Sequence, residues 1–206
     1  MPTDFRDLLE PTTTVLLTQE CQRGVVGPNS MIPELARVAR ESGAIANATR
    51  LVHGARAAGV GVVHALAARR HDGRGANTNA RLFVSVARQR DQQWLGTDAT
   101  LPVEEFGTDD ADLTSTRLHG LSPIVGQDVD GLLRNLGCRT VVIVGVSTNV
   151  AIPNAVFDAV NLGYQVVVPV DAIAGVPLEY TDLLVRNSLS LVATTTTTDN
   201  VLSCWR

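Results

Sequence analysis

The sequence of 206 residues has few aromatic side chains and no excess of positive charge. Aromatic residues make up 4% of the chain, and the net charge at pH 7 is −4. No basic stretch is interleaved with aromatic rings, the pattern that binds single-stranded nucleic acid. A net negative charge also disfavours binding to polyanions. We therefore expect no nucleic-acid partner.

Long hydrophobic runs and cysteines are scarce as well. No apolar run approaches the roughly 20 residues that a membrane-spanning helix needs. The N-terminus, MPTDFRDLLEP, lacks the apolar core of a signal peptide. Cys21, Cys138 and Cys204 are widely separated and show no CxxC spacing, which fits a reducing compartment better than a disulfide framework. We expect a cytoplasmic protein that does not associate with a membrane.

The chain contains hydrophobic segments with the periodicity of strands, which alternate with segments that have the periodicity of helices. Hydrophobic residues make up 45% of it, enough for one sizeable core, so we expect a single domain over 1–206. Periodicity and end signals predict strands at 13–19, 59–66, 113–117, 139–146, 164–171 and 191–198. The same signals predict helices at 33–59, 81–90, 128–137, 153–162 and 178–189. The segment 67–111 is a long excursion, and such excursions are often functional.

Strands rich in Val and Ile that alternate with helices favour parallel β-α-β units. The predicted fold is therefore an α/β three-layer α-β-α sandwich with a mostly parallel sheet of about six strands. The threonine-rich strand at 191–198 suits a sheet edge. Ligands of such sheets bind at the carboxyl ends of the strands, so the residues that follow each strand are the candidates for a site.

Two such segments stand out. Gln19-Glu20-Cys21-Gln22 follows the first strand, and GVSTNVAIPNAVFDA, residues 145–159, follows the fourth. Because successive strand residues point to opposite sides, Cys21 is expected in the core if Glu20 faces a pocket. The second segment has the inert Ala151 at its centre. Ser147 and Thr148 lie outside any GxSxG elbow and are expected to hydrogen-bond the turn.

These segments resemble a known family. LLTQECQRGVVG is similar to the first-strand motif of the isochorismatase-like hydrolases, also called the cysteine hydrolase superfamily. GVSTNVAIPNAVFDAVNLGYQVVVPVDAIAG resembles the longest signature of that family, which spans a turn, a helix, a glycine and a strand in one register. The resemblance covers roughly residues 12–197. It implies a hydrolase with a small-molecule substrate, and we expect a homo-oligomer, either a dimer or a tetramer.

Carried over to this chain, the catalytic triad of the family is altered at every position. The catalytic Asp falls on Glu20, the Lys near Arg117, and the nucleophilic Cys on Ala151. The usual amidase mechanism needs a thiolate that attacks a carbonyl carbon, and a methyl group cannot do this. The resemblance therefore supports the fold and argues against the thiol mechanism.

The family includes a second chemistry, hydrolysis of a vinyl ether, which begins with protonation of the alkene by the first-strand carboxylate. For Glu20 to act in this way, an apolar setting must keep a protonated fraction near neutral pH. Arg117 would oppose this if the two groups pair closely. Arginine also cannot shuttle a proton, because its pKa exceeds about 12. We expect Arg117 to hold a substrate carboxylate with a bidentate fork.

Further substrate contacts are predicted from position. Gln22, His64 and His119 follow or end strands, although His64 is equally well explained as a structural histidine. The N–H groups of the turn are expected to form an anion-binding nest at a helix start, a position that Pro153 suits; the nest comprises Asn149, Val150, Ala151 and Ile152. Arginines 69, 70 and 74 and Asp72 are interpreted as solvated or as part of a subunit contact.

No metal or cofactor is expected. The nicotinamidase branch of the family binds a metal through an Asp and histidines after the second strand. Here His64, His71 and Asp72 occur in that region without HxxxH or DxH spacing. GxGxxG and P-loop patterns are absent, so no nucleotide cofactor is implied.

Three hypotheses remain open. The first is a cofactor-independent hydrolase of a small carboxylate-bearing metabolite, with Glu20 as acid or base and Arg117 as anion clamp. The second is a non-catalytic relative that binds a small molecule or serves assembly. The third is a cysteine hydrolase whose nucleophile was replaced by Ala151. The first is preferred, because Glu for Asp and Arg for Lys preserve charge at two positions.

Overall fold

A parallel β-sheet forms the centre of the molecule. The computed structural model describes residues 4–89 and 92–206. The strand order is β3-β2-β1-β4-β5-β7, with β6 paired to β4, and each pairing between these strands is parallel. The strands are β1 (Thr14–Gln19), β2 (Gly61–Ala67), β3 (Leu113–Arg117), β4 (Thr140–Val146), β5 (Gln165–Pro169), β6 (Ile173–Ala174) and β7 (Thr194–Thr196). The expected parallel sheet is thus confirmed, with the threonine strand β7 at one edge.

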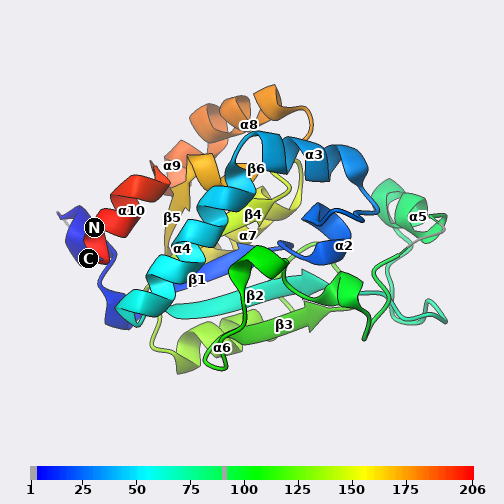
Figure 1. Ribbon diagram of the computed structural model, residues 1–206, viewed down its shortest axis with the longest axis horizontal. Coiled ribbons are helices and arrows are strands. Elements are labelled where there is room, and N and C mark those ends of the chain that lie inside the picture. The colour runs from blue at the N-terminus through cyan, green and yellow to red at the C-terminus, as the bar shows by residue number, and fades with distance from the viewer. Residues whose placement is uncertain (1–3, 90–91) are drawn as a thin grey trace.

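Helices cover both faces of this sheet (Figure 1). The core on one face includes side chains of α3, α4 and α10, and the core on the other includes side chains of α6, α7 and α8. The α-helices are α1 (Phe5–Leu8), α2 (Arg23–Val26), α3 (Pro33–Glu41), α4 (Ala44–Ala58), α5 (Arg81–Ala87), α6 (Val129–Asn135), α7 (Ala151–Asn161), α8 (Leu178–Leu184), α9 (Ser190–Val192) and α10 (Thr198–Cys204). The predicted three-layer sandwich is therefore confirmed.

Several element boundaries differ from those expected. The single helix predicted over 33–59 is two helices, α3 and α4, because Gly43 has a φ of 81° and breaks the helical path. Helix α7 begins at Ala151, two residues before Pro153, which a first turn accommodates because no intrahelical N–H bond is needed there. The helix predicted over 81–90 ends at Ala87, and position 90 lies outside the described residues.

The last helical region is more irregular than its pattern indicates. Helix α8 continues as a π-helical turn over Val185–Leu189 and then as α9. Leu184 and Leu189, five residues apart, are both buried, because the wider π-turn returns position i+5 to the same face. This extension and the cap of α10 by Thr197 shorten β7 relative to the predicted strand. No helix among the described residues is long and apolar enough to cross a membrane.

Candidate active site

The carboxyl ends of β1, β3 and β4 open into one cavity. Gln19 of β1 pairs with Gly145 of β4, and Ala67 of β2 pairs with Arg117 of β3, so these strand ends lie at one edge of the sheet. The cavity has a volume of about 400 Å³, and Glu20, Arg117 and Ala151 all line it. The structure therefore brings together the three positions that the family resemblance singled out.

Glu20 is held in an unusual backbone conformation. Its φ of 51° is left-handed, which costs a non-glycine residue on the order of 1–3 kcal/mol. The turn takes Glu20 out of the alternation of β1, while its N–H donates to the carbonyl of Ala65 at 2.9 Å. Backbone strain of this size persists where the surroundings enforce it, as they do at functional sites.

The two carboxylate oxygens of Glu20 have different surroundings. Oε1 accepts hydrogen bonds from Nε2 of Gln19 at 3.1 Å and from Nη2 of Arg117. Oε2 has no partner among residues 4–89 and 92–206, and it is not sealed from solvent. One oxygen is therefore fixed, and the other is accessible from the cavity.

Arg117 is engaged by the protein itself. Its side chain is 9% exposed, Nη2 donates to Glu20, and Nε donates to the carbonyl of Gly120 at 3.4 Å. Nη1 is buried without a partner in the described part of the chain. The predicted bidentate clamp on a substrate carboxylate does not match this geometry, because the guanidinium fork already holds Glu20 and the loop after β3.

The preserved positive charge at Arg117 is also weaker evidence for a functional role than the motif indicates. The sequence contains no lysine, so all 17 of its basic residues are arginines. An arginine near the place where the resemblance puts the family lysine therefore follows the composition of the whole chain. Its role depends on its contact with Glu20.

The turn between β4 and α7 is tightly held. The carbonyl of Ser147 accepts from the N–H of Val150 at 3.3 Å and of Ile152 at 3.0 Å. The Asn149 amide exchanges two hydrogen bonds with the backbone of Val176, at 2.6 and 2.9 Å. Of the four N–H groups in the predicted nest, those of Val150 and Ile152 are therefore occupied. Those of Asn149 and Ala151 have no acceptor within the described residues.

Ala151 is the first residue of α7 and is 6% exposed. It lines the cavity together with Ser147, Asn149 and Val150. The position onto which the resemblance places the family nucleophile therefore faces the same space as Glu20, and it presents a methyl group.

Three predicted substrate contacts do not line the cavity. The Gln22 side chain is buried and bonds the backbone of Ala67 twice and of Ala99 once, so it joins loops. Ile152 is packed in the core between the sheet and α7. His64 is also buried, and its surroundings are given below. None of these three side chains lines the cavity, because segments distant in sequence bury them.

His64 belongs to a buried network. Its Nδ1 lies 2.8 Å from the Thr18 hydroxyl, and its Nε2 lies 3.0 Å from Oδ2 of Asp112. The ring stacks on Phe106 with centroids 5.6 Å apart. Burial lowers the pKa of His64, and this effect outweighs the opposing effect of Asp112. These contacts favour the structural interpretation of His64 over the pocket one.

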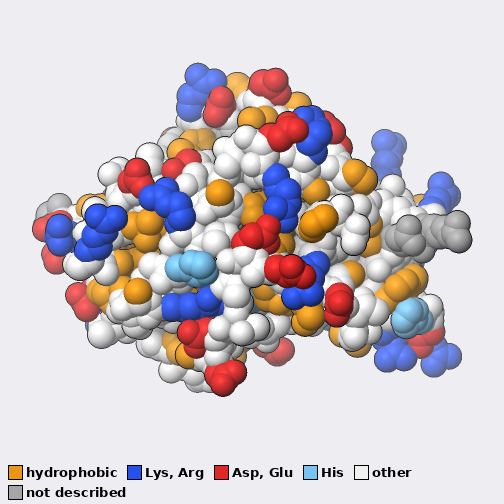
Figure 2. Space-filling model, viewed as in Figure 1, with side chains coloured by type: hydrophobic (Ala, Val, Ile, Leu, Met, Phe, Trp, Pro, Cys, Tyr) orange, Lys and Arg blue, Asp and Glu red, His pale blue; other side chains and the backbone are white. Residues whose placement is uncertain are grey.

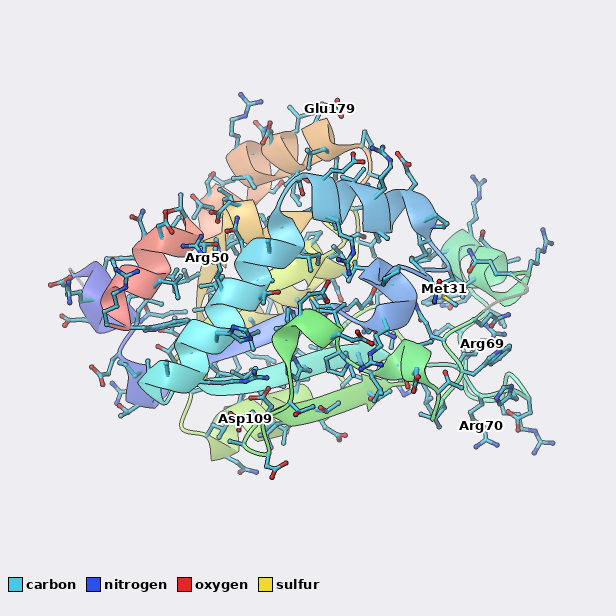
Figure 3. All side chains as sticks on the ribbon, in the orientation of Figure 1. Met31, Arg50, Arg69, Arg70, Asp109 and Glu179 are labelled. Carbon is cyan, nitrogen blue, oxygen red and sulfur yellow. The ribbon has the colours of Figure 1, made fainter. Side chains whose placement is uncertain are left out.

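The cavity also contains residues that the motifs do not indicate. His119 lines it as expected, with Nδ1 3.3 Å from the Gln127 amide. Arg69 and apolar side chains of the excursion complete the lining; these include Leu82, Phe83 and Val86 of α5, and Met31 and Leu35 lie in the same wall. Figure 3 labels Met31 and Arg69 on the same side of the molecule, near α2 and the excursion. The length of the 67–111 excursion was the sequence signal for this wall.

Two further expectations concern cysteine and metal. Cys21 is buried in the core, as predicted, although the left-handed conformation of Glu20 ends the alternation of β1 before it. Burial, followed by the nearby Glu20, raises the pKa of its thiol to about 12. His71 stacks on Trp94 at 4.5 Å. Within the described ranges, no group of three or more His, Cys, Asp or Glu side chains could hold a metal ion.

Comparison with known proteins identifies the family. Residues 14–200 match the Isochorismatase domain family. The chain belongs to this family. The isochorismatase-family protein YwoC of Bacillus subtilis (strain 168), itself uncharacterized, is 30% identical over 100 residues, which are 48% of this chain and 52% of YwoC. The chain thus spans about half the length of the curated relative that it matches.

Solved structures support the fold of this isochorismatase-family protein. A cysteine hydrolase from Pseudomonas syringae pv. phaseolicola 1448A is 20% identical with a TM-score of 0.82, over 95% of this chain and 93% of that one. N-carbamoylsarcosine amidase from Thermoplasma acidophilum is 19% identical with a TM-score of 0.70, over 91% and 97% of the two chains. At this identity the likeness establishes the fold, and the chemistry depends on the site.

Proposed function

We propose that this hydrolase acts on a small carboxylate-bearing molecule without a covalent thiol intermediate, with Glu20 as its acid–base group. The proposal rests on the contrast between Ala151 and Glu20 inside the cavity. Ala151 offers no nucleophile, whereas Oε2 of Glu20 is open to the cavity. Because both donors to Glu20 converge on Oε1, a proton on this carboxyl group resides on Oε2. The ion pair with Arg117 is the arrangement that opposes this protonation, so the reaction requires a proton to be taken up at Oε2 against it.

The reaction that best fits these groups is hydrolysis of an enol ether. Oε2 gives its proton to the alkene carbon, a C–H bond forms as the π bond breaks, and the ether oxygen stabilises the resulting oxocarbenium ion. Water adds to this cation and returns a proton to Glu20. The hemiketal then breaks its C–O bond, giving a carbonyl compound and an alcohol. A positioned acid–base group typically accelerates such a step by about 10²- to 10⁴-fold.

Arg69 is better placed than Arg117 to bind the substrate carboxylate. It lines the cavity, and its backbone N–H and C=O are fixed by Gln93 at 2.7 Å and Leu95 at 2.9 Å. No carboxylate among residues 4–89 and 92–206 pairs with its guanidinium. An arginine whose fork is available is suited to bidentate binding of a carboxylate. The apolar side chains of α5 then cover the rest of a small substrate.

The test compares Glu20→Gln with the wild type on enol ethers bearing a carboxylate, and on simple amides and esters. Glu20→Gln removes the exchangeable proton and keeps the shape, so turnover should fall by about 10²- to 10⁴-fold while binding changes little. Glu34→Gln is the matched control, because Glu34 also lines the cavity but pairs with Arg37 at 2.7 Å. Ala151→Ser should keep the activity.

A non-catalytic binding protein is the competing function, and the Glu20–Arg117 ion pair gives it a specific basis. In that case Glu20 is a structural partner of Arg117. Calorimetry would then detect binding of a substrate-like carboxylate, no substrate of the panel would turn over, and Glu20→Gln would leave binding unchanged. This combination of results would refute the proposed hydrolase activity.

A further inference from the structure

The apolar side chains of α5 belong to no part of the hydrophobic core. None of the described residues of this helix, 81–87, is buried, and none of them is a member of the core on either face of the sheet. Leu82, Phe83 and Val86 lie along one side of the helix, and all three line the cavity that contains Glu20. An amphipathic helix normally turns such a face to the core. Here the cavity takes the place of the core.

A second apolar wall of the cavity comes from the segment that begins α3. Met31, Ile32 and Leu35 line the cavity. Leu35 is 7% exposed and Ile32 packs against the core beneath it, so the protein itself fixes this wall. In Figure 2 hydrophobic side chains reach the surface around α2, on the side of the molecule that carries α5. The cavity therefore has one apolar wall that the core supports and one, α5, that the core does not cover.

Several polar side chains of the cavity are already paired within the protein. Oδ1 of Asn77 accepts from the N–H of Gly120 at 2.7 Å, and Nδ2 of Asn77 donates to Asn79 at 3.1 Å. The Asn149 amide is occupied in the same way by the backbone of Val176. A ligand hydroxyl that enters loses its water and finds these side chains occupied, which is unfavourable. An apolar group removes the apolar walls from water instead, which is favourable.

The surroundings of α5 favour a negatively charged ligand. Residues 67–89 contain five arginines and one acidic residue, whereas the whole chain has a net charge of −4. The acidic residue, Asp72, pairs with Arg70 at 2.8 Å, and Arg69 lines the cavity itself. A local surplus of positive charge raises the concentration of anions and their rate of association.

We infer that the substrate of this site joins its carboxylate to a ring-sized apolar group that carries no hydroxyls. The carboxylate lies at Arg69, the apolar group lies between α5 and the start of α3, and Phe83 determines the specificity for that group. An enclosed apolar cavity of about 150 Å³ takes a benzene ring, so a cavity of about 400 Å³ also has room for the carboxylate and the reacting bond. The inference rests on the proposed function, to which it adds the chemical class of the substrate.

The test uses two probes of equal charge and ring size, cyclohexanecarboxylate and 3,4,5-trihydroxycyclohexanecarboxylate. NMR titration of the full chain measures both dissociation constants, including millimolar ones. Cyclohexanecarboxylate should bind at least about tenfold more tightly, because the three hydroxyl groups of the other probe lose their hydration on entry. Equal affinities, tighter binding of the hydroxylated ring, or no binding of either probe overturns the inference.

A substitution on α5 tests the role of its apolar face. Phe83→Ala removes the ring from the cavity wall and should weaken binding of cyclohexanecarboxylate by about tenfold, while binding of acetate, which has no ring, should not change. Val84→Ala is the matched control on the same helix, because Val84 is 38% exposed and does not line this cavity; it should bind both probes as the wild type does. An equal loss for both probes in Phe83→Ala, or no loss, overturns the role of Phe83.

Turnover separates this inference from the proposed reaction. The substrates are two carboxylate-bearing enol ethers, one with the cyclohexane ring and one with the trihydroxylated ring. Preferred binding of the apolar ring without turnover of either enol ether refutes the hydrolase activity and supports the inferred ligand class. Turnover of the hydroxylated enol ether with a kcat/KM equal to or above that of the apolar one supports the hydrolase activity and overturns the inferred ligand class.

Discussion

Two of the three thiols are in environments that suppress nucleophilic attack. Burial, followed by the nearby Glu20, raises the pKa of Cys21 to about 12, and burial also raises the pKa of Cys138 to about 12. A thiol is nucleophilic as the thiolate, so neither is reactive near neutral pH. Cys204 lies on α10, which does not line the cavity. No cysteine of the described residues lines the cavity, which supports the proposed mechanism without a thiol.

Alkylation tests this view directly. Treatment with iodoacetamide at pH 7 should leave turnover of an enol ether within about twofold of the untreated protein, because none of the three thiols lines the cavity. Mass spectrometry of the treated protein shows which cysteines react. Loss of activity in proportion to modification of Cys21 would contradict the proposed mechanism.

Arg117 is the residue whose interpretation changed most between sequence and structure. If Arg117 clamped the substrate, its replacement by lysine would mainly weaken substrate binding. In the structure its fork holds Glu20 and the carbonyl of Gly120, and one ammonium group cannot reproduce that planar geometry.

The prediction for Arg117→Lys is therefore a loss of kcat. Misplacement of Glu20 should lower kcat by about 10- to 100-fold, with a smaller change in KM. Arg69→Lys should show the opposite pattern, with an increase in KM that exceeds the change in kcat. Steady-state kinetics of the two variants separates the positioning role from the binding role, and identical patterns would refute the distinction.

The turn and α8 form one rigid unit because their backbones approach closely at a glycine. A Cβ atom on Gly175 would lie 2.1 Å from Oγ1 of Thr148 and 2.6 Å from Oδ1 of Asn149. Real Cβ atoms do not approach other atoms so closely, so the turn must shift to accommodate one. Gly175 therefore permits the hydrogen bonds that connect the turn to the start of α8.

Gly175→Ala should cost roughly 1–3 kcal/mol of unfolding free energy, the usual penalty of overpacking. It should also lower turnover, because the turn carries Ala151 and the N–H groups beside it. Gly131→Ala is the matched control, since nothing lies within 4 Å of its added Cβ. Urea unfolding and kinetics on the two variants check this prediction, and an unchanged stability of Gly175→Ala would disprove it.

A buried polar network joins three adjacent strands near the centre of the molecule. Thr18 of β1, His64 of β2 and Asp112, just before β3, are connected by hydrogen bonds. Burial alone would raise the pKa of Asp112, but hydrogen bonds from Arg56 and His64 outweigh it and lower that pKa. His64 is buried in the folded state, and this burial lowers its pKa.

This network predicts how stability depends on pH. Below about pH 6.5 the unfolded chain takes up a proton on His64 that the folded protein does not bind. Stability should therefore fall as pH decreases from 7 towards the folded pKa, by at most about 1.4 kcal/mol per pH unit for this one proton. Above pH 7 this contribution should be constant.

The measurement is the urea unfolding free energy between pH 5 and 8. His64→Gln can still form hydrogen bonds and should flatten the slope below pH 7, at some cost in overall stability. His53→Gln removes an exposed histidine on α4 and should retain the wild-type slope. Equal slopes for the wild type and His64→Gln would contradict the assignment.

Local patterns predicted much of the fold and part of the site. The alternation of apolar strands with helices indicated a parallel three-layer sandwich, because strands buried on both faces read as continuous Val and Ile runs, such as residues 140–146. The motifs placed Glu20, Arg117 and Ala151 at strand ends, and parallel strands bring such ends to one edge. Cys21 was assigned to the core by the alternation of β1. Each of these properties depends on residues close together in the sequence.

The tertiary structure decided which of the candidates share a cavity and what holds them. Gln22 and His64 look like pocket residues at their strand ends, but loops distant in sequence supply Ala99, Asp112 and Phe106, which bury them. Arg69 and α5 became part of the site because the excursion folds back over the strand ends. Nη2 of Arg117 contacts Glu20, 97 residues away, so we propose for Arg117 a supporting role rather than that of a clamp. Sequence periodicity reports the face on which a side chain lies, whereas long-range packing determines the groups that it meets there.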